Sequence, residues 1–275
     1  MARPKKPKPV ALVTGASAGM GKDFALRLIQ EGYIVYGGAR RVDNMKEITA
    51  AGGHALALDV TDEAQARAAI AHIIAEQGRV DVLINNAGYG QYGAVEDVPL
   101  SEARRQMEVN LFGLALMSQL VLPHMRRQKG GTIFNISSIG GKVAMPMGGW
   151  YHASKFAVEA LSDALRLEVR PFGIDVVVIE PGGIASEWSG IAVQEAQRYS
   201  AQGPYAKLAG AMVKIQTGIT ALPPPSIISD LIVKALKSRR PKTRYAGGHM
   251  AGPILTLRRI LSDRQLDGLI ASQLK

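Results

Sequence analysis

The residues with the clearest potential for chemistry are Tyr151 and Lys155, which lie four positions apart in a segment with a helical pattern. Residues at this spacing project from one face of a helix. A phenol can transfer a proton, and a neighbouring ammonium group favours its ionised form. The same spacing also occurs by chance on amphipathic helices. Whether the pair is catalytic therefore has to be judged from the other motifs of the chain.

A glycine-rich segment, Thr14-Gly15-Ala16-Ser17-Ala18-Gly19-Met20-Gly21, follows an apolar run at residues 10–13. Apolar residues at helical spacing come next, so the segment is predicted to turn from a strand into a helix. Glycines there let a ligand approach the backbone, and the helix N-terminus offers N–H groups to phosphate. The spacing differs from G-x-G-x-x-G and lacks the Lys-Ser/Thr of a P-loop. A tight turn without a ligand is the alternative.

The second apolar run, residues 33–36, leads into Gly37-Gly38-Ala39-Arg40-Arg41, which contains no acid. A carboxylate at this place would bind the ribose hydroxyls of NAD and repel a 2′-phosphate. A guanidinium group can instead bind the phosphate with paired hydrogen bonds. The sequence therefore favours NADP(H), with Arg40 and Arg41 at the phosphate, unless these arginines are only solvated.

Strands and helices alternate along the chain. Apolar runs predict strands at 10–13, 33–36, 54–58, 80–84, 132–136, 174–179 and 243–246, and helical patterns occupy the intervals, including 101–127 and 151–170. Such alternation requires a parallel sheet with right-handed crossovers, and nearly continuous apolar strands indicate helices on both faces. We expect one α/β domain over 10–275, a Rossmann-type doubly wound sheet of about seven strands.

Two helical additions are expected after the sixth strand: a lid over about 187–222 and a C-terminal extension over about 247–275. Polar motifs close several strands, namely Asp59-Val60, Asn85-Asn86-Ala87-Gly88 and Ser137-Ser138. Because ligands of open α/β sheets bind outside the carboxyl ends of the strands, these motifs should share one edge with the glycine-rich turn.

Taken in order, these motifs strongly resemble those of the short-chain dehydrogenase/reductase family. The resemblance spans about residues 10–190 and rests on Thr14-Gly15-x-x-x-Gly19-x-Gly21, Asn85-Asn86-Ala87-Gly88, Asn110, Ser138, Tyr151-x-x-x-Lys155 and Pro181-Gly182. The segments 110–113 and 171–174 also look like the branch that contains 17β-hydroxysteroid and retinol dehydrogenases.

The resemblance implies a catalytic set of four residues. Tyr151 would protonate a carbonyl oxygen while NADPH delivers hydride, and would act as the base in the reverse direction. Lys155 would lower the pKa of the phenol and bind the nicotinamide ribose. Ser138 would donate a hydrogen bond to the substrate oxygen, and Asn110 would help to hold a water that links Lys155 to solvent.

The resemblance also implies the cofactor contacts. Asp59 and Val60 would contact adenine, and residues 86–88 would line the adenosine ribose. The full expected set is Gly15, Ser17, Gly19, Met20, Gly21, Arg40, Arg41, Asp59, Val60, Asn86, Ala87, Gly88, Tyr151, Lys155, Pro181, Gly182, Ile184 and Ser186. This chain departs from the family pattern at Ser186, where threonine is frequent, and at Ala18, where many NADP-dependent members have a basic residue.

The predicted substrate is a small apolar alcohol or carbonyl compound, such as a steroid, a retinoid or an alicyclic ketone. Its contacts are expected from Tyr89, Met145, Met147, Trp150 and Trp188, although core packing could also explain the methionines. Two alternatives are a non-catalytic NADP-binding sensor or scaffold and a reductase of carrier-protein-bound ketoacyl groups.

Composition narrows the setting. The 275 residues include no cysteine, which excludes disulfides and thiolate metal sites, and the five histidines show no metal-ligand spacing. No apolar run approaches the ~20 residues of a membrane span, and a signal peptide is not evident, so we expect a cytoplasmic protein.

The net charge of +10 is concentrated at the two ends. Residues 1–9, expected as a flexible basic tail, and residues 234–275 together carry about +12, which leaves about −2 for the remainder. No recognition motif accompanies this charge, so we expect no nucleic-acid partner. The basic amphipathic segment 252–261 could touch a membrane surface, but packing on its own domain or a sister subunit is favoured. The resemblance implies a homodimer or homotetramer.

Overall fold

The computed structural model describes residues 7–186, 188–218 and 221–274. Its centre is a parallel sheet with the strand order β3-β2-β1-β4-β5-β6-β7. The strands are β1 (Val10–Thr14), β2 (Ile34–Ala39), β3 (His54–Ala57), β4 (Val82–Asn85), β5 (Gly131–Ile136), β6 (Ile174–Pro181) and β7 (Arg244–Gly247). The predicted doubly wound sheet of seven strands is thereby confirmed.

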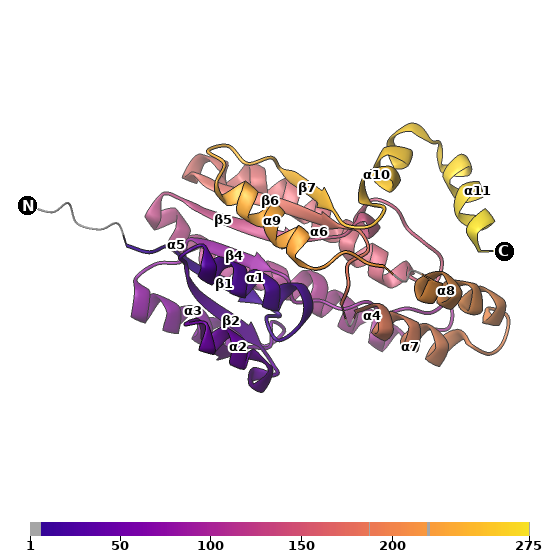
Figure 1. The fold of residues 1–275 in the computed structure, drawn as a ribbon, viewed down its shortest axis with the longest axis horizontal. Coiled ribbons are helices and arrows are strands. Elements are labelled where there is room, and N and C mark those ends of the chain that lie inside the picture. The colour runs from indigo at the N-terminus through magenta and orange to yellow at the C-terminus, as the bar shows by residue number, and fades with distance from the viewer. Residues whose placement is uncertain (1–6, 187, 219–220, 275) are drawn as a thin grey trace, which may run out of the picture.

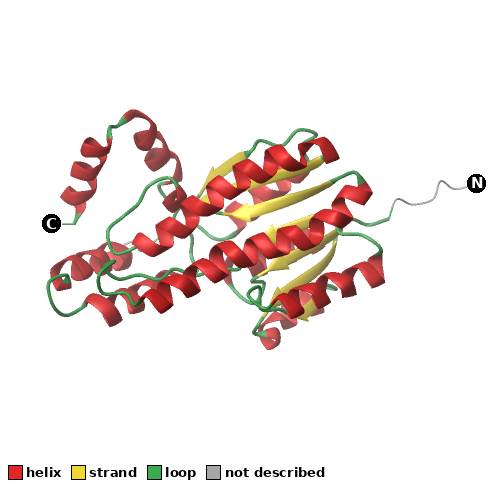
Figure 2. Ribbon diagram, turned by 180° about the vertical axis from the view of Figure 1, so that it is seen from behind, coloured by secondary structure: helices red, strands yellow, loops and turns green. Residues whose placement is uncertain are grey.

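Helices cover both faces of this sheet (Figures 1 and 2). One apolar core joins the sheet to α1 (Gly19–Gln30), α2 (Lys46–Ala50) and α9 (Ser226–Leu236). A second core joins the opposite face to α3 (Glu63–Gln77), α5 (Gly113–Gln128) and α6 (Gly149–Val169). Burial on both faces explains why the central strands read as continuous apolar runs.

The sheet has its topological switch point between β1 and β4. The chain winds outward from β1 to β3 and then crosses back to begin the other half at β4. In parallel sheets a ligand crevice forms at this point, outside the carboxyl ends of the strands. The glycine-rich turn after β1 and the Asn85–Gly88 motif after β4 flank it, so the fold brings these two predicted motifs together.

Four helices lie beyond this carboxyl edge (Figure 1). Helices α7 (Trp188–Ser200) and α8 (Ala206–Gly218) follow β6 in the segment predicted to form a lid, and α10 (Ala251–Ile260) and α11 (Asp263–Gln273) are the last two helices. Ser262 and Gln265 form a capping box that starts α11. No helix in the described part of the chain is long and apolar enough to cross a membrane. The predicted tail is described only at residues 7–9.

The single helix predicted over 101–127 is wrong in one respect. The segment forms α4 (Leu100–Met107) and α5, separated by a π-helical turn at Glu108–Phe112. Such turns occur frequently at functional sites. The apolar spacing continues through the segment, so the interruption was not visible in the pattern. The buried residue of this turn is Asn110, whose contacts are given below.

Candidate active site at the carboxyl edge of the sheet

Tyr151 and Lys155 lie on the buried face of α6, and each is only 7% exposed. The Lys155 ammonium donates a hydrogen bond of 2.8 Å to the carbonyl of Ile136, the last residue of β5. Its nitrogen is 5.9 Å from the centre of the Tyr151 ring. The helix therefore presents both groups to the carboxyl edge of the sheet, as their spacing predicted.

Ser138 follows β5 and begins a short 3-10 turn, where its hydroxyl accepts a hydrogen bond of 3.0 Å from the Gly140 amide. Burial raises the pKa of Tyr151 to about 12, and a hydrogen bond with Ser138 opposes that rise. Lys155 was expected to lower this pKa. In the protein without cofactor, the loss of hydration around the phenolate has the larger effect and raises the pKa.

Asn110 is buried in the π-helical turn and ties three segments together. Its side-chain oxygen accepts from the Tyr89 amide at 3.1 Å, and its side-chain nitrogen donates to the Tyr89 carbonyl and the Ser154 hydroxyl, both at 3.0 Å. Ser154 in turn donates to the carbonyl of Tyr151. Both N–H donors of Asn110 are thus occupied. The role of Asn110 in holding a water stays a prediction. The water would bind to the second lone pair of the side-chain oxygen or to the backbone carbonyl of Asn110.

Next to Lys155 lies an ionic network around the buried Glu159, which the sequence reasoning missed. Glu159, one helical turn further along α6, accepts from Lys142 at 2.7 Å and from Arg244 at 3.0 Å, and Arg244 also pairs with Asp163. Burial lowers the pKa of Lys155 to about 8, and the negative charge of Glu159 opposes this shift. The sequence did contain an indication of this network, because Tyr151, Lys155, Glu159 and Asp163 recur every four residues and so share one face of the helix.

The glycine-rich turn has the shape that a dinucleotide requires. Gly15 and Gly19 have φ values of +68° and +53°, which favour glycine. A Cβ on Gly21 would lie 2.3 Å from the Gly15 carbonyl oxygen, so that glycine permits close packing of the turn. Helix α1 begins after Ala18 without a side-chain cap, which leaves its first N–H groups directed at the edge where phosphate would bind.

The motif after β4 braces this turn. The Asn86 side chain donates to the carbonyl oxygens of Thr14 at 3.0 Å and Gly15 at 3.3 Å. The Thr14 hydroxyl accepts from the backbone amides of Asn86 and Ala87. The side-chain amide of Asn86 is therefore occupied by these bonds within the protein. The expected contacts of Asn86, Ala87 and the exposed Gly88 with the ribose stay predictions, and for Asn86 the contact would come from backbone atoms.

The remaining cofactor candidates gather at the same edge. Arg40 and Arg41 follow β2 and are exposed, whereas Val60 is buried and Asp59 uses one carboxylate oxygen to accept from the amide and hydroxyl of Thr61. Ser17 and Met20 are half-buried in the glycine-rich turn and the first turn of α1.

The segment after β6 crosses to the glycine-rich turn. Gly182 donates to the Gly247 carbonyl at 2.8 Å, and the Ser186 Cβ lies 3.6 Å from the place where a Cβ on Gly19 would stand. Pro181 accepts from Ser138 at 3.4 Å, and Ile184 is buried. The segment after β6 thus approaches the glycine-rich turn at Gly19, and it approaches Ser138 at Pro181.

The substrate candidates divide into polar and apolar groups. Tyr89 and Trp150 bury their hydroxyl and indole N–H without a hydrogen-bond partner among the described residues. Since an unpaired buried donor is costly, these atoms suit a polar group of a ligand. Met147 is buried in a left-handed conformation, and Met145 is half-buried. Trp188 begins α7, but its side chain lies outside what the structure describes.

Two aromatic neighbours of Tyr151 were missed. The Tyr92 ring is 5.8 Å from that of Tyr151, between ring centres. The buried His152 donates from Nδ1 to the Gly140 carbonyl at 2.9 Å. Burial lowers the pKa of His152, which keeps the imidazole neutral and makes it a spacer between α6 and the 3-10 turn. Tyr92 lies three residues after Tyr89, which was predicted as a substrate contact. Among the described residues, no cluster of acidic and histidine side chains could hold a metal ion.

Comparison with protein families gives a match to the short chain dehydrogenase model over residues 9–197. A probable short-chain type dehydrogenase/reductase, VdlC of Helicobacter pylori, is 37% identical over 94% of this chain and 96% of its own. A 3-ketodihydrosphingosine reductase of Bacteroides thetaiotaomicron is 48% identical over 63% of each chain. An NADPH-dependent 3-dehydrocapnine reductase of Ornithobacterium rhinotracheale is 32% identical over 96% of this chain and 97% of its own.

Solved structures give the same result. A short-chain dehydrogenase from Streptomyces avermitilis superposes with a TM-score of 0.81 at 34% identity and covers 98% of this chain and 95% of its own. A metagenomic short-chain oxidoreductase in complex with NADP reaches 0.69 at 28% identity over 88% of this chain and 97% of its own. The narrower likeness to hydroxysteroid and retinol dehydrogenases stays a prediction, since none of these five proteins carries either name.

Proposed function

This chain belongs to the short-chain dehydrogenase/reductase family, and we propose that it is an NADPH-dependent reductase of a ketone carried by a hydrophobic molecule. The observation that carries the proposal is the buried Tyr151 hydroxyl, hydrogen-bonded to Ser138 and one helical turn from the Lys155 ammonium. These groups meet at the sheet edge where the glycine-rich turn begins α1.

The residues act in sequence on the substrate oxygen. The chemistry that bound NADPH supplies is transfer of a hydride to the carbonyl carbon. Ser138 donates a hydrogen bond to the oxygen as negative charge develops, and Tyr151 gives it the proton that completes the alcohol. The Lys155 ammonium stabilises the resulting phenolate until solvent returns a proton. Because burial raises the Tyr151 pKa to about 12, the phenol is protonated at neutral pH and can act as the acid in the reduction.

The choice of NADP(H) rests on charge at the end of β2. Arg40 and Arg41 stand there with no carboxylate, so a 2′-phosphate meets cations. The reductase of Ornithobacterium rhinotracheale is named as NADPH-dependent, and the metagenomic structure contains NADP. Both agree with this choice.

A ketone on a hydrophobic molecule fits the walls around Tyr151. The apolar cluster that contains this residue includes Met147, Ala192, Ala209 and Met212. The unpaired Tyr89 hydroxyl and Trp150 indole could bond a polar group beside the ketone. The names of two relatives, a 3-ketodihydrosphingosine reductase and a 3-dehydrocapnine reductase, are consistent with a reducible oxo group.

We also infer a cytoplasmic homodimer or homotetramer. The absence of cysteine suits a reducing compartment. Large apolar side chains remain exposed near and along α5 and α6, at Phe112, Phe156 and Leu167, and a sister subunit would cover them. Sedimentation analysis would report a monomer if this inference is wrong.

The test is to follow NADPH absorbance with a panel of steroid, retinoid, alicyclic and straight-chain ketones. Consumption of NADPH with at least one ketone, together with formation of its alcohol, is expected. If NADPH binds but no ketone on the panel is reduced, the sensor or scaffold alternative replaces this function.

A further inference from the structure

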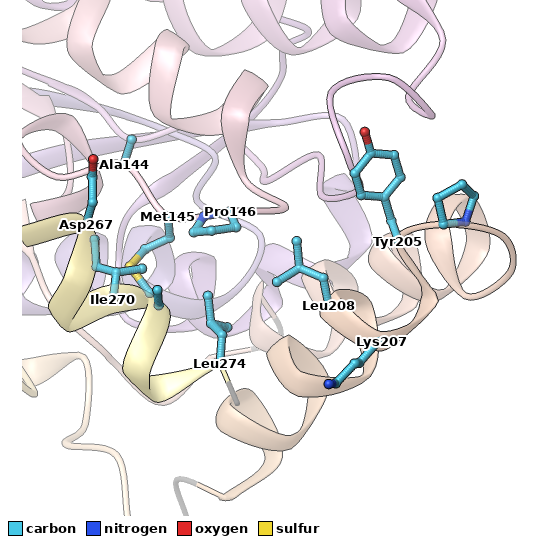
Figure 3. Close-up of a pocket in the computed structure, with 11 residues that line it drawn as sticks. Ala144, Met145, Pro146, Tyr205, Lys207, Leu208, Asp267, Ile270 and Leu274 are labelled. Atoms are coloured by element: carbon cyan, nitrogen blue, oxygen red, sulfur yellow. The ribbon is translucent and has the colours of Figure 1, made fainter. Parts of the chain in front are cut away.

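A cavity of about 770 Å³ lies between helix α8, C-terminal helix α11 and the segment that leads into α6 (Figure 3). We call it the tail groove. It is lined by Ala144, Met145, Pro146, Pro204, Tyr205, Lys207, Leu208, Asp267, Ile270, Ala271 and Leu274. None of these residues was assigned a function above except Met145, so the groove is a separate feature adjoining the proposed active site.

Most of the side chains that line the groove are apolar. Its charged members, Lys207 and Asp267, are exposed and stand at the rim on opposite walls. The Tyr205 hydroxyl is engaged outside with Glu96 at 2.6 Å. The apolar side chains of the groove can therefore stabilise mainly hydrocarbon.

The tail groove and the apolar cluster around Tyr151 have two residues in common. Tyr205 and Leu208 pack against the apolar cluster that contains Tyr151, Met147 and Met212. Met145 and Pro146 directly precede Met147, whose carbonyl accepts from the Gly93 amide at 2.7 Å. A chain attached to a ketone at Tyr151 would pass these methionines, whose unbranched side chains adapt to irregular shapes.

We propose that the tail groove binds the alkyl chain of an amphiphilic ketone whose oxo group is reduced at Tyr151. The inference rests on the proposed function and names its substrate class. If each methylene takes about the 30 Å³ share of a water molecule in the liquid, the cavity has room for roughly 25 such groups. A chain of ten or more carbons therefore fits, whereas a compact alicyclic ketone would leave the groove unfilled.

The experiment measures kcat/KM with NADPH for a series of 2-alkanones from six to eleven carbons. Burying one methylene is worth a factor of about four, so kcat/KM should rise by up to that factor for each added carbon that enters the groove. A matched pair of variants on α11 locates the effect. Ile270 lines the groove, and its neighbour Leu269 is 41% exposed and does not line it.

Ile270→Asp should reduce the 2-undecanone to 2-hexanone ratio of kcat/KM by at least tenfold, whereas Leu269→Asp should preserve the wild-type ratio. Equal kcat/KM along the series in the wild-type enzyme would overturn the groove while leaving the reductase function intact. No reduction of any ketone would overturn the proposed function itself. An unchanged ratio in Ile270→Asp, with a change in the sedimented mass, would identify the groove as a subunit interface and so overturn the proposal.

Discussion

At the scale of single residues, the proposed chemistry depends on how burial shifts the pKa values of Tyr151 and Lys155. Loss of hydration raises the pKa of Tyr151 to about 12 and lowers that of Lys155 to about 8. Both shifts favour the neutral forms. Glu159 opposes the second shift, and its own charge is balanced by Lys142 and Arg244. The network thus keeps a cation beside the phenol at neutral pH.

This arrangement predicts a pH dependence. Lys155 loses its proton as the pH rises through about 8, so kcat/KM for NADPH, which reports groups of the free enzyme, should fall above that pH. Glu159→Gln removes the charge that raises the Lys155 pKa, and the decline should move to lower pH. Initial rates between pH 5 and 10 test this, and coincident profiles for the two proteins would exclude a role for Glu159 in tuning Lys155.

Arg40 sets the second prediction at this scale. Arg40→Asp places a carboxylate where a 2′-phosphate is proposed to bind, so the ratio of kcat/KM for NADPH over NADH should fall by at least about tenfold, equivalent to about 1.4 kcal/mol. Arg170→Asp makes the same charge change at an exposed site near the opposite edge of the sheet and should leave the ratio alone. Equal effects of both variants would point to net charge and remove Arg40 from the phosphate site.

At the scale of elements, the glycine-rich turn and the motif after β4 form one unit. Gly21 lies so close to Gly15 and Asn86 that a Cβ would approach their atoms to 2.3 and 2.5 Å. The atoms around this Cβ position belong to the backbone of Gly15 and to the hydrogen-bonded side-chain amide of Asn86, so moving them would disrupt the turn. The site therefore depends on packing between two strand ends that are 70 residues apart in the chain.

Gly21→Ala should destabilise the protein by about 1–3 kcal/mol and weaken NADPH binding, because it displaces the turn. Urea unfolding and a fluorescence titration with NADPH measure the two effects. The control is Gly252→Ala in α10, where nothing lies within 4 Å of the added carbon, and a neutral effect or a gain of up to about 1 kcal/mol is expected. Wild-type NADPH affinity in Gly21→Ala would contradict the close-packed turn.

At the scale of the whole molecule, the sheet and its carboxyl edge were predictable because parallel strands leave continuous apolar runs and end in glycine and polar motifs. The motif residues Gly15 and Asn86 converge as that rule requires. The π-helical turn around Asn110 was not predictable, since it depends on hydrogen bonds to Tyr89 and Ser154 that only the fold brings within reach.

The tail groove shows the same limit. Its walls come from three segments separated by more than 50 residues, and nothing in the pattern of α11 indicates that Ile270 faces α8 while Leu269 faces solvent. The ionic network of Glu159, in contrast, left a four-residue repeat along α6 that the sequence displays. Prediction succeeded at the strand ends, where the rule for parallel sheets places distant motifs at one edge, and it failed at the groove, where no such rule applies.

The central claim, that Tyr151 supplies the proton for reduction by NADPH, is tested most directly by Tyr151→Phe. This variant removes the hydroxyl and keeps the ring against Tyr92. The dissociation constant of NADPH should change by less than about threefold, while kcat/KM for the best ketone on the panel should fall by about 10²–10⁴-fold, the usual contribution of a general acid. Turnover at the wild-type rate with NADPH bound normally would contradict the account.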